Sequence, residues 1–231
     1  MIYKITALTV QKRNRQRVNV FLDGEFAFGL ARITAAWLEV GQEISDEKIA
    51  ELKAEDAREV AYLQALKYLN YRPRTEAEVR QNLLKHAVPE EIIPETIERL
   101  KQNRLLDDSR FAQDWVENRT DLRPRSRRAL AYELRQRGVD RQVIEQSLDA
   151  LDDEELAYQA ALKQSRKLKN LDWQDFRQKM YGFLARRGFH YEVCAPVVSR
   201  VWAELHAEEN NANGLYGDLS EHNLSNEEGD S

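Results

Sequence analysis

The 231-residue chain lacks most of the residue types that build disulfide or metal frameworks. Its single cysteine, Cys194, has no partner within the chain, so we expect a reducing, cytoplasmic environment. The four histidines share no metal-ligand spacing with one another or with Cys194, so no metal site is expected. No apolar run approaches the ~20 residues that cross a bilayer, and the N-terminus lacks the apolar core of a signal peptide. These absences predict a protein without disulfides, bound metal or membrane segments.

Catalytic sequence motifs are missing as well. The nine glycines form no nucleophile elbow, phosphate-binding loop or dinucleotide-binding pattern. Acidic residues cluster where helices are expected to begin, as at Asp107-Asp108 and Asp152-Asp153, where they stabilise the helix start. We therefore expect neither a catalytic centre nor a cofactor, and we predict that the protein is not an enzyme.

The net charge of −5 is unevenly distributed. Residues 207–231 contain seven acidic residues and no Lys or Arg. Residues 1–206 hold 35 basic and 33 acidic residues, so the body of the chain is mildly basic. Because the C-terminal stretch also has few large apolar side chains, we predict a disordered acidic tail over residues 207–231.

The first 55 residues predict a small antiparallel β-hairpin segment with short helices. Strands are expected over Lys4–Val10, Arg17–Leu22 and Glu25–Leu30, which are rich in β-branched and aromatic residues. Asp23-Gly24 fits the two-residue turn of a hairpin, and a short helix is expected near Ala31–Trp37. Three strands with so few apolar side chains need a surface to pack on, so we do not expect an independent domain.

From Ser45 onward, apolar residues recur at helical spacing. Ser45 is expected to cap a helix over Asp46–Lys53, and further helices are expected over Asp56–Leu69 and with Pro89 in a first turn. Four apolar columns then repeat at spacings of 51 and 50 residues: Leu83, Leu134 and Leu184; Val88, Val139 and Phe189; Ile92, Val143 and Val193; Leu100, Leu151 and Val201. This period predicts a mainly α fold, a tandem array of three three-helix repeats at residues 56–105, 106–151 and 152–206.

Two repeats share a helix start preceded by arginines. Thr75 and Glu78 form a capping box, in which each side chain accepts a backbone N–H of the other residue. Arg72-Pro73-Arg74 precedes it, and Arg123-Pro124-Arg125 precedes Ser126, 51 residues on. Paired arginines beside a helix N-terminus can bind an anion. Alternatively, they bind carbonyl groups that end the previous helix.

The segment Arg119–Arg137 is the most basic in the chain, with seven arginines against Asp121 and Glu133. A solvated helix face explains most charge runs, but such runs usually mix signs. Contact with DNA phosphates or with an acidic protein surface is the other interpretation. Pairs of basic residues also occur near the C-terminus of the second helix in each repeat. The helix dipole alone favours cations there; alternatively, the pairs form a basic stripe along one edge of the array. The predicted binding residues are Arg72, Arg74, Arg80, Arg119, Arg123, Arg125, Arg127, Arg128, Arg135, Arg137, Arg186 and Arg187.

The four tryptophans, Trp37, Trp115, Trp173 and Trp202, stand among apolar neighbours. We expect them in the core rather than as stacking platforms for bases. Cys194 lies in a helical apolar stripe and is expected to be buried.

The repeats resemble the RecX family of regulators of the bacterial recombinase RecA. The resemblance rests, in family order, on ALKYLNYRPRTEAEVRQNLL, RLLDDSRFAQDWVENR, RRALAYELRQRGV, DEELAYQAALKQSRKL and FLARRGFHYEVCAPVV, and it covers about residues 57–205. The N-terminal segment is similar to the extension of longer family members, whereas the acidic tail matches no family feature.

The resemblance implies an all-α body of three three-helix units that binds RecA in the groove of its filament on DNA. It further implies modulation, usually inhibition, of strand exchange and filament growth, with effects on DNA repair and the SOS response. We also expect a monomer that binds single- or double-stranded DNA weakly. Two other functions stay open: a direct nucleic-acid-binding helical protein, against which the mildly basic body argues, and a scaffold for another protein.

Overall fold

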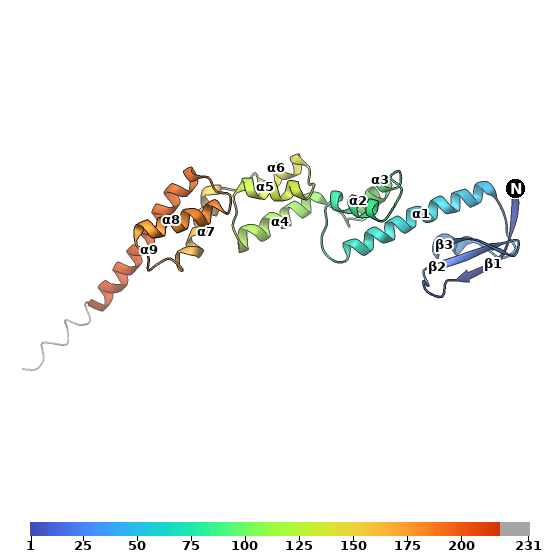
Figure 1. Ribbon diagram of the computed structural model, residues 1–231, viewed down its shortest axis with the longest axis horizontal. Coiled ribbons are helices and arrows are strands. Elements are labelled where there is room, and N and C mark those ends of the chain that lie inside the picture. The colour runs from blue at the N-terminus through green and yellow to red at the C-terminus, as the bar shows by residue number, and fades with distance from the viewer. Residues whose placement is uncertain (218–231) are drawn as a thin grey trace, which may run out of the picture. The chain divides into compact units, whose positions relative to one another are not determined.

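The computed structural model describes the backbone of residues 1–217 and the side chains of residues 1–207. The described chain is mainly helical with a small N-terminal antiparallel sheet, as predicted (Figure 1). It divides into two compact units, and the border between them follows Phe111.

The first unit begins with a four-stranded antiparallel sheet. Its strands are β1 (Ile2–Val10), β2 (Arg17–Leu22), β3 (Glu25–Ala31) and β4 (Glu43–Ser45), in the order β3-β2-β1-β4. Three of them were predicted, and Gly24 has the positive φ of 95° that the hairpin turn requires. The sequence analysis missed β4 because it has three residues, of which only Ile44 is buried.

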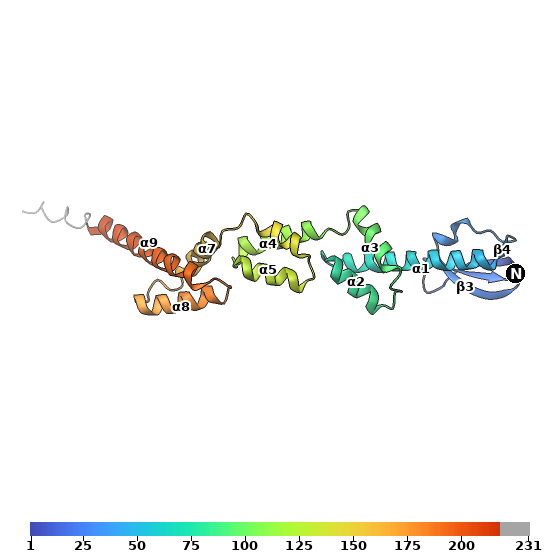
Figure 2. The same cartoon turned by 90° about the horizontal axis from the view of Figure 1, so that it is seen from above.

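One long helix, α1 (Asp46–Leu69), connects the sheet to the first repeat. It begins at Ser45, whose hydroxyl accepts the N–H of Lys48 as predicted. The expectation of two helices was wrong, because no glycine or proline interrupts residues 46–69. Figure 2 shows its N-terminal part beside the sheet and its C-terminal part beside α2 (Glu76–Lys85) and α3 (Ile93–Gln102). The boundary proposed at residue 55 therefore falls inside a helix that both parts share.

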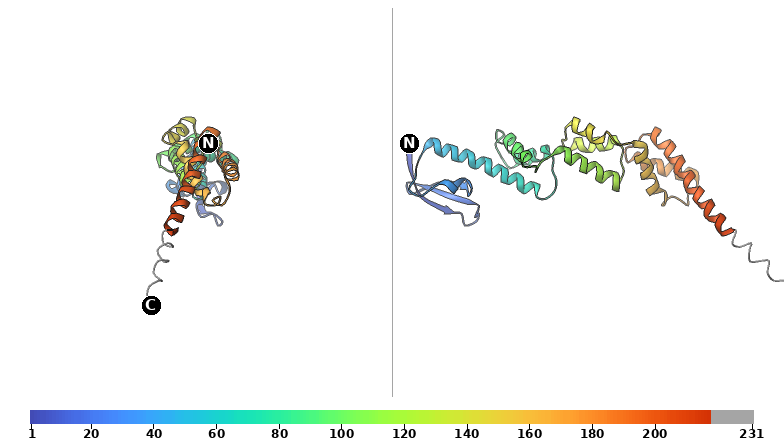
Figure 3. Two further views of the ribbon diagram at one scale, coloured as in Figure 1. Left: turned by 90° about the vertical axis from the view of Figure 1, so that its left-hand side faces the viewer. Right: turned by 180° about the vertical axis from the view of Figure 1, so that it is seen from behind.

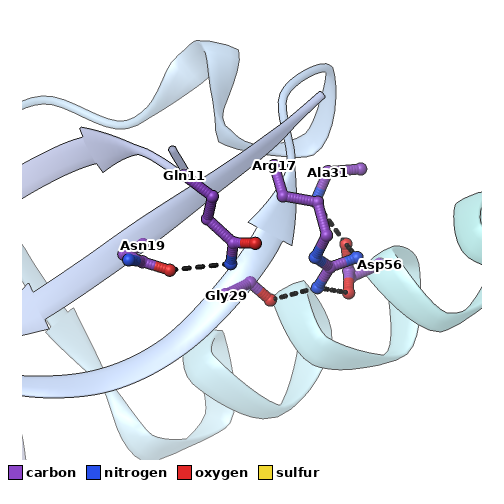
Figure 4. A network of polar contacts seen from close by, with 6 residues as sticks. All are labelled: Gln11, Arg17, Asn19, Gly29, Ala31 and Asp56. Atoms are coloured by element: carbon purple, nitrogen blue, oxygen red, sulfur yellow. Dashed lines mark hydrogen bonds and ion pairs between the residues drawn. The ribbon is translucent and has the colours of Figure 1, made fainter. Parts of the chain in front are cut away.

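A partly buried ion pair fastens α1 to the sheet (Figure 4). Arg17 of β2 pairs with Asp56 of α1, with 2.9 Å between Nη2 and Oδ2, and also donates to the carbonyl of Gly29 at 2.8 Å. Asp56 accepts the backbone N–H of Ala31 as well. The pair fixes the helix against the sheet edge, and α1 supplies the packing surface that the sheet was expected to need.

The first repeat consists of the C-terminal part of α1 with α2 and α3. The predicted capping box is present: Thr75 accepts the N–H of Glu78 at 3.2 Å, and Glu78 accepts the N–H of Thr75 at 3.4 Å. The third helix begins later than predicted. Pro89 lies in a preceding turn, where its carbonyl accepts the N–H of Ile92, and Pro94 occupies the first helical turn instead.

The second and third repeats make up most of the second unit. The second comprises α4 (Asp108–Leu122), α5 (Arg127–Gln136) and α6 (Arg141–Leu148). The third comprises α7 (Asp153–Ser165), α8 (Trp173–Ala185) and α9 (Tyr191–Gly217). Leu83, Leu134 and Leu184 of the first predicted column are fully buried, one in each repeat. After α5 and α8, Gly138 and Gly188 have positive φ, as expected of glycines that end a helix.

Two further expectations were wrong. Trp37 is 88% exposed, because the single 3₁₀ turn η1 (Thr34–Trp37) directs Thr34 and Ala35 inward and leaves the indole outside. The helix α9 continues past Ala207, where the acidic tail was expected to begin (Figure 3): Pro196 lies near its start, and residues 208–217 contain no further proline. The rest of the expected tail, residues 218–231, lies outside the described residues.

Candidate partner-binding surface

The helix starts that were predicted to bind anions already hold carboxylates of the chain itself. At the start of α2, the N–H of Glu76 donates to Asp108 at 2.8 Å. At the start of α5, the N–H of Arg127 donates to Asp153 at 2.7 Å. In both cases the first residue of the second helix in one repeat is bonded to the first residue of the first helix in the next repeat. An external anion would therefore meet a helix start that is already occupied.

The arginines of the first repeat contact neighbouring side chains. Arg72 makes two contacts with Glu78, at 2.9 and 3.2 Å, and so supports the capping box. The guanidinium of Arg74 lies over the ring of Tyr68, 4.0 Å from its centroid. Arg80 lies 3.6 Å from Glu76 on the same helix. These contacts give the three predicted binding residues structural roles.

A second group of arginines converges on Glu133 in α5. The carboxylate accepts from Arg119 at 3.1 Å and from the indole of Trp115 at 2.9 Å, and it pairs with Arg125 at 2.7 Å. Arg119 and Arg137 also lie over the indole, with 4.5 and 4.1 Å to its centroid. Glu133 thereby orders the basic segment and joins α4 to α5.

The end of α8 in the third repeat lies against the turn before α5. Arg187 donates to the carbonyl of Pro124 at 3.3 Å, and its own carbonyl accepts the N–H of Ser126 at 3.1 Å. Burial lowers the pKa of Arg187, and the charges of Arg125, Arg123 and Arg186 lower it further. The structure thus brings together arginines from two predicted groups that are about 60 residues apart in the sequence.

Five of the predicted residues are exposed and form no ion pair with any residue whose side chain the structure describes: Arg123, Arg127, Arg128, Arg135 and Arg186. We call these five the unpaired arginines. All of them belong to the second unit, and Arg123 and Arg186 both act on the pKa of Arg187. Repulsion of this kind favours the approach of an anionic partner, because the described side chains supply no counter-charge to these five arginines.

Tyr132 was not among the predicted site residues. It is 60% exposed and lies on α5 between Arg128 and Arg135, at helical spacings of four and three residues. With Arg128, Ala129, Ala131, Arg135 and Gly188 it lines a cleft of about 310 Å³. An aromatic residue spaced to share a helix face with two arginines was the signal in the sequence that could have identified it.

The structure also describes the cysteine and the tryptophans that were expected to be buried. Cys194 is buried as expected, and burial raises the pKa of its thiol. Trp173 and Trp202 pack against the core of the third repeat, with their ring centroids 5.4 Å apart. No helix in the described part of the chain is long and apolar enough to cross a membrane.

A small sheet followed by three-helix repeats, with unpaired arginines on one unit, defines a helical-repeat protein with an exposed basic surface. Four family descriptions match the chain in order. They are the regulatory protein RecX N-terminal domain over residues 3–45, and the first, second and third three-helix domains of RecX over residues 61–100, 107–148 and 152–198.

Known proteins agree with these matches. The chain is 34% identical to the regulatory protein RecX of Clostridium botulinum (strain Alaska E43) over 202 residues, which cover 84% of this chain and 94% of the relative. It is 33% identical to the regulatory protein RecX of Bacillus pumilus over 195 residues, 82% of this chain and 74% of the relative. A crystal structure of a regulatory protein RecX superposes with a TM-score of 0.66 at 28% identity, covering 84% of this chain and 98% of that one. The chain belongs to the RecX family of regulatory proteins.

Proposed function

We propose that this protein is a non-enzymatic modulator of the RecA recombinase that binds the RecA–DNA filament and inhibits it. Through that contact it would regulate homologous recombination, DNA repair and the SOS response. Membership of a family of regulatory proteins supports the proposal. The unpaired arginines are the observation that carries it, because they give the second unit an exposed surface that a filament of protein and DNA phosphate would complement.

In this proposal the protein acts as a monomer in the bacterial cytoplasm. Residues 56–105, 106–151 and 152–206 serve as three successive repeats, and the segment 1–55 is fastened to the first of them by α1 and the Arg17–Asp56 pair. Repeats of this kind present long surfaces to elongated partners. The arginines engaged with Glu78 and Glu133 hold the turns in place, while the unpaired arginines contact the partner.

The ATPase activity of RecA on single-stranded DNA tests the proposal. Adding the wild-type protein at or below the RecA concentration should slow ATP hydrolysis. A triple variant, Arg123→Gln, Arg127→Gln and Arg186→Gln, should inhibit much less and should lose most of the dependence of inhibition on salt. These side chains are exposed and unpaired, so the variant should unfold at the same urea concentration as the wild type.

A matched control removes the same charge elsewhere on the second unit. Arg166, Lys167 and Lys169 are exposed and lie between α7 and α8, and changing all three to Gln should leave inhibition unchanged. A wild-type protein that leaves RecA's ATPase unaffected at stoichiometric amounts would overturn the proposed function. Equal losses in the two triple variants would show that net charge, rather than this surface, controls inhibition.

A further inference from the structure

The cleft on α5 combines groups suited to a specific ligand chemistry. Arg128, Tyr132 and Arg135 are exposed at positions i, i+4 and i+7, so they share one face of the helix. The two arginine positions are about 10 Å apart along the helix axis. Small residues form the rest of the lining, namely Ala129, Ala131 and Gly188.

The backbone at Gly188 lines one side of this cleft. An added Cβ at Gly188 would lie 2.6 Å from the hydroxyl of Ser126 and 2.8 Å from Cβ of Ala129, so the backbone after α8 lies directly against α5. A side chain at this position would push the two segments apart. The close approach therefore fixes the position of Gly188, which lines the cleft together with Arg128 and Arg135.

The polar and aromatic groups of the cleft have no partner within the described part of the chain. Arg128 and Arg135 form no ion pair there, and Tyr132 has neither a hydrogen bond nor a ring contact with a described residue. Glu133, the acidic residue of α5, is next to Tyr132 in the sequence and therefore points to a different side of the helix. Its carboxylate forms ion pairs with Arg119 and Arg125. Two guanidinium groups and one phenol ring are thus available to a ligand together.

We propose that this cleft binds a single strand of nucleic acid, with a base stacked on Tyr132 and phosphates bound by Arg128 and Arg135. The inference deepens the proposed function, in which this strand is the DNA of the filament. A guanidinium group can bind a phosphate through two parallel hydrogen bonds, and an exposed aromatic ring stacks on bases of any sequence. An acidic peptide would also satisfy the arginines, but it would leave the tyrosine ring without a planar partner.

Direct binding of a labelled oligothymidylate at low salt, without RecA, tests the inference. Tyr132→Leu should weaken binding by about fivefold to a hundredfold, whereas Tyr132→Phe, which keeps the ring, should bind like the wild type. Arg128→Gln and Arg135→Gln should each weaken binding and each reduce the salt slope by about 1. Two controls should bind as the wild type does: Tyr71→Leu, at an exposed tyrosine of the first unit, and Arg166→Gln.

Three results would overturn the inference. The wild type could fail to bind the oligonucleotide, or Tyr132→Leu could bind it as tightly as the wild type does. Alternatively, oligoglutamate could displace the oligonucleotide from Arg128 and Arg135 with no contribution from Tyr132, which would assign the cleft to an acidic protein segment. The assay contains no RecA, so its outcome is separate from that of the ATPase experiment on the proposed function.

Discussion

Replacing Gly188 by alanine should destabilise the junction between the second and third repeats. Gly188 has a φ of 90°, in the left-handed region where a Cβ costs about 1–2 kcal/mol. The added Cβ would also lie 2.8 Å from Cβ of Ala129 and 2.6 Å from the hydroxyl of Ser126, and crowding of this kind costs about 1–3 kcal/mol. We therefore expect Gly188→Ala to lower the free energy of unfolding of this region by about 2–5 kcal/mol.

Gly41→Ala is the matched control. Gly41 has a φ of 97°, and an added Cβ there would meet no atom within 4 Å. It therefore has the same backbone strain and the same reduction of unfolded-state entropy without the crowding. The two variants should therefore differ by about 1–3 kcal/mol in the free energy of unfolding that each loses, and this difference measures the crowding at the contact between the repeats.

Hydrogen exchange followed by mass spectrometry suits this comparison, because a chain of two compact units need not unfold in one step. Gly188→Ala should raise exchange in α5 and α8, and Gly41→Ala should raise it in the sheet. A double-mutant cycle with Ala129→Gly should show favourable coupling, since that change removes the 2.8 Å contact. Equal losses for the two alanine variants, or no coupling, would refute the reasoning and show that Ser126 and Ala129 move aside.

Three further predictions concern the acidic residues and caps that organise the arginine-rich turns. Burial raises the pKa of Asp108, so its contribution to stability falls as pH rises from the ordinary pKa of a carboxyl group through the raised value. Asp108→Asn keeps an acceptor for the N–H of Glu76, so the variant should resist urea better than the wild type at pH 7. The difference in stability should vanish in acid, and a variant less stable than the wild type at pH 7 would contradict this. Glu133→Gln should lower the free energy of unfolding in urea by about 1–2 kcal/mol. It should also increase the salt slope of oligonucleotide binding by about 1, because Arg119 and Arg125 lose the carboxylate that pairs with them. An unchanged slope would count against this electrostatic explanation. Thr75→Ala should cost about 1 kcal/mol in thermal unfolding, and no loss would show that the capping box contributes nothing to stability.

Local chemistry in the sequence predicted much of the fold. The capping box at Thr75, the cap at Ser45 and the glycines after α5 and α8 each depend on a few neighbouring residues, and the structure contains all of them. The apolar period identified the repeats because each repeat buries the same leucine position. Features with weak local signals were missed: the three-residue β4, the continuity of α1, and the outward direction of Trp37.

The candidate site was less predictable, because pairing between side chains depends on tertiary placement. The sequence predicted the basic residues but not which of them Glu133 would neutralise, as Arg119 lies 14 positions before it in another helix. Nor did it predict that Arg187 would reach the turn at Pro124, 63 positions away. The spacing of Tyr132 from Arg128 and Arg135 was visible in the sequence, but the cleft that it lines with Gly188 depends on the fold.

The two roles of the acidic helix-start residues explain where the exposed positive charge lies. Asp108 and Asp153 each begin a helix of their own, and each also accepts the first N–H of the second helix in the preceding repeat. The arginine-rich turns therefore do not need an external anion to be stable, since Glu78 and Glu133 neutralise arginines beside them. The chain lacks such a carboxylate for Arg128 and Arg135 within the described residues, and a partner that brings phosphates to this face of α5 would supply the missing charge.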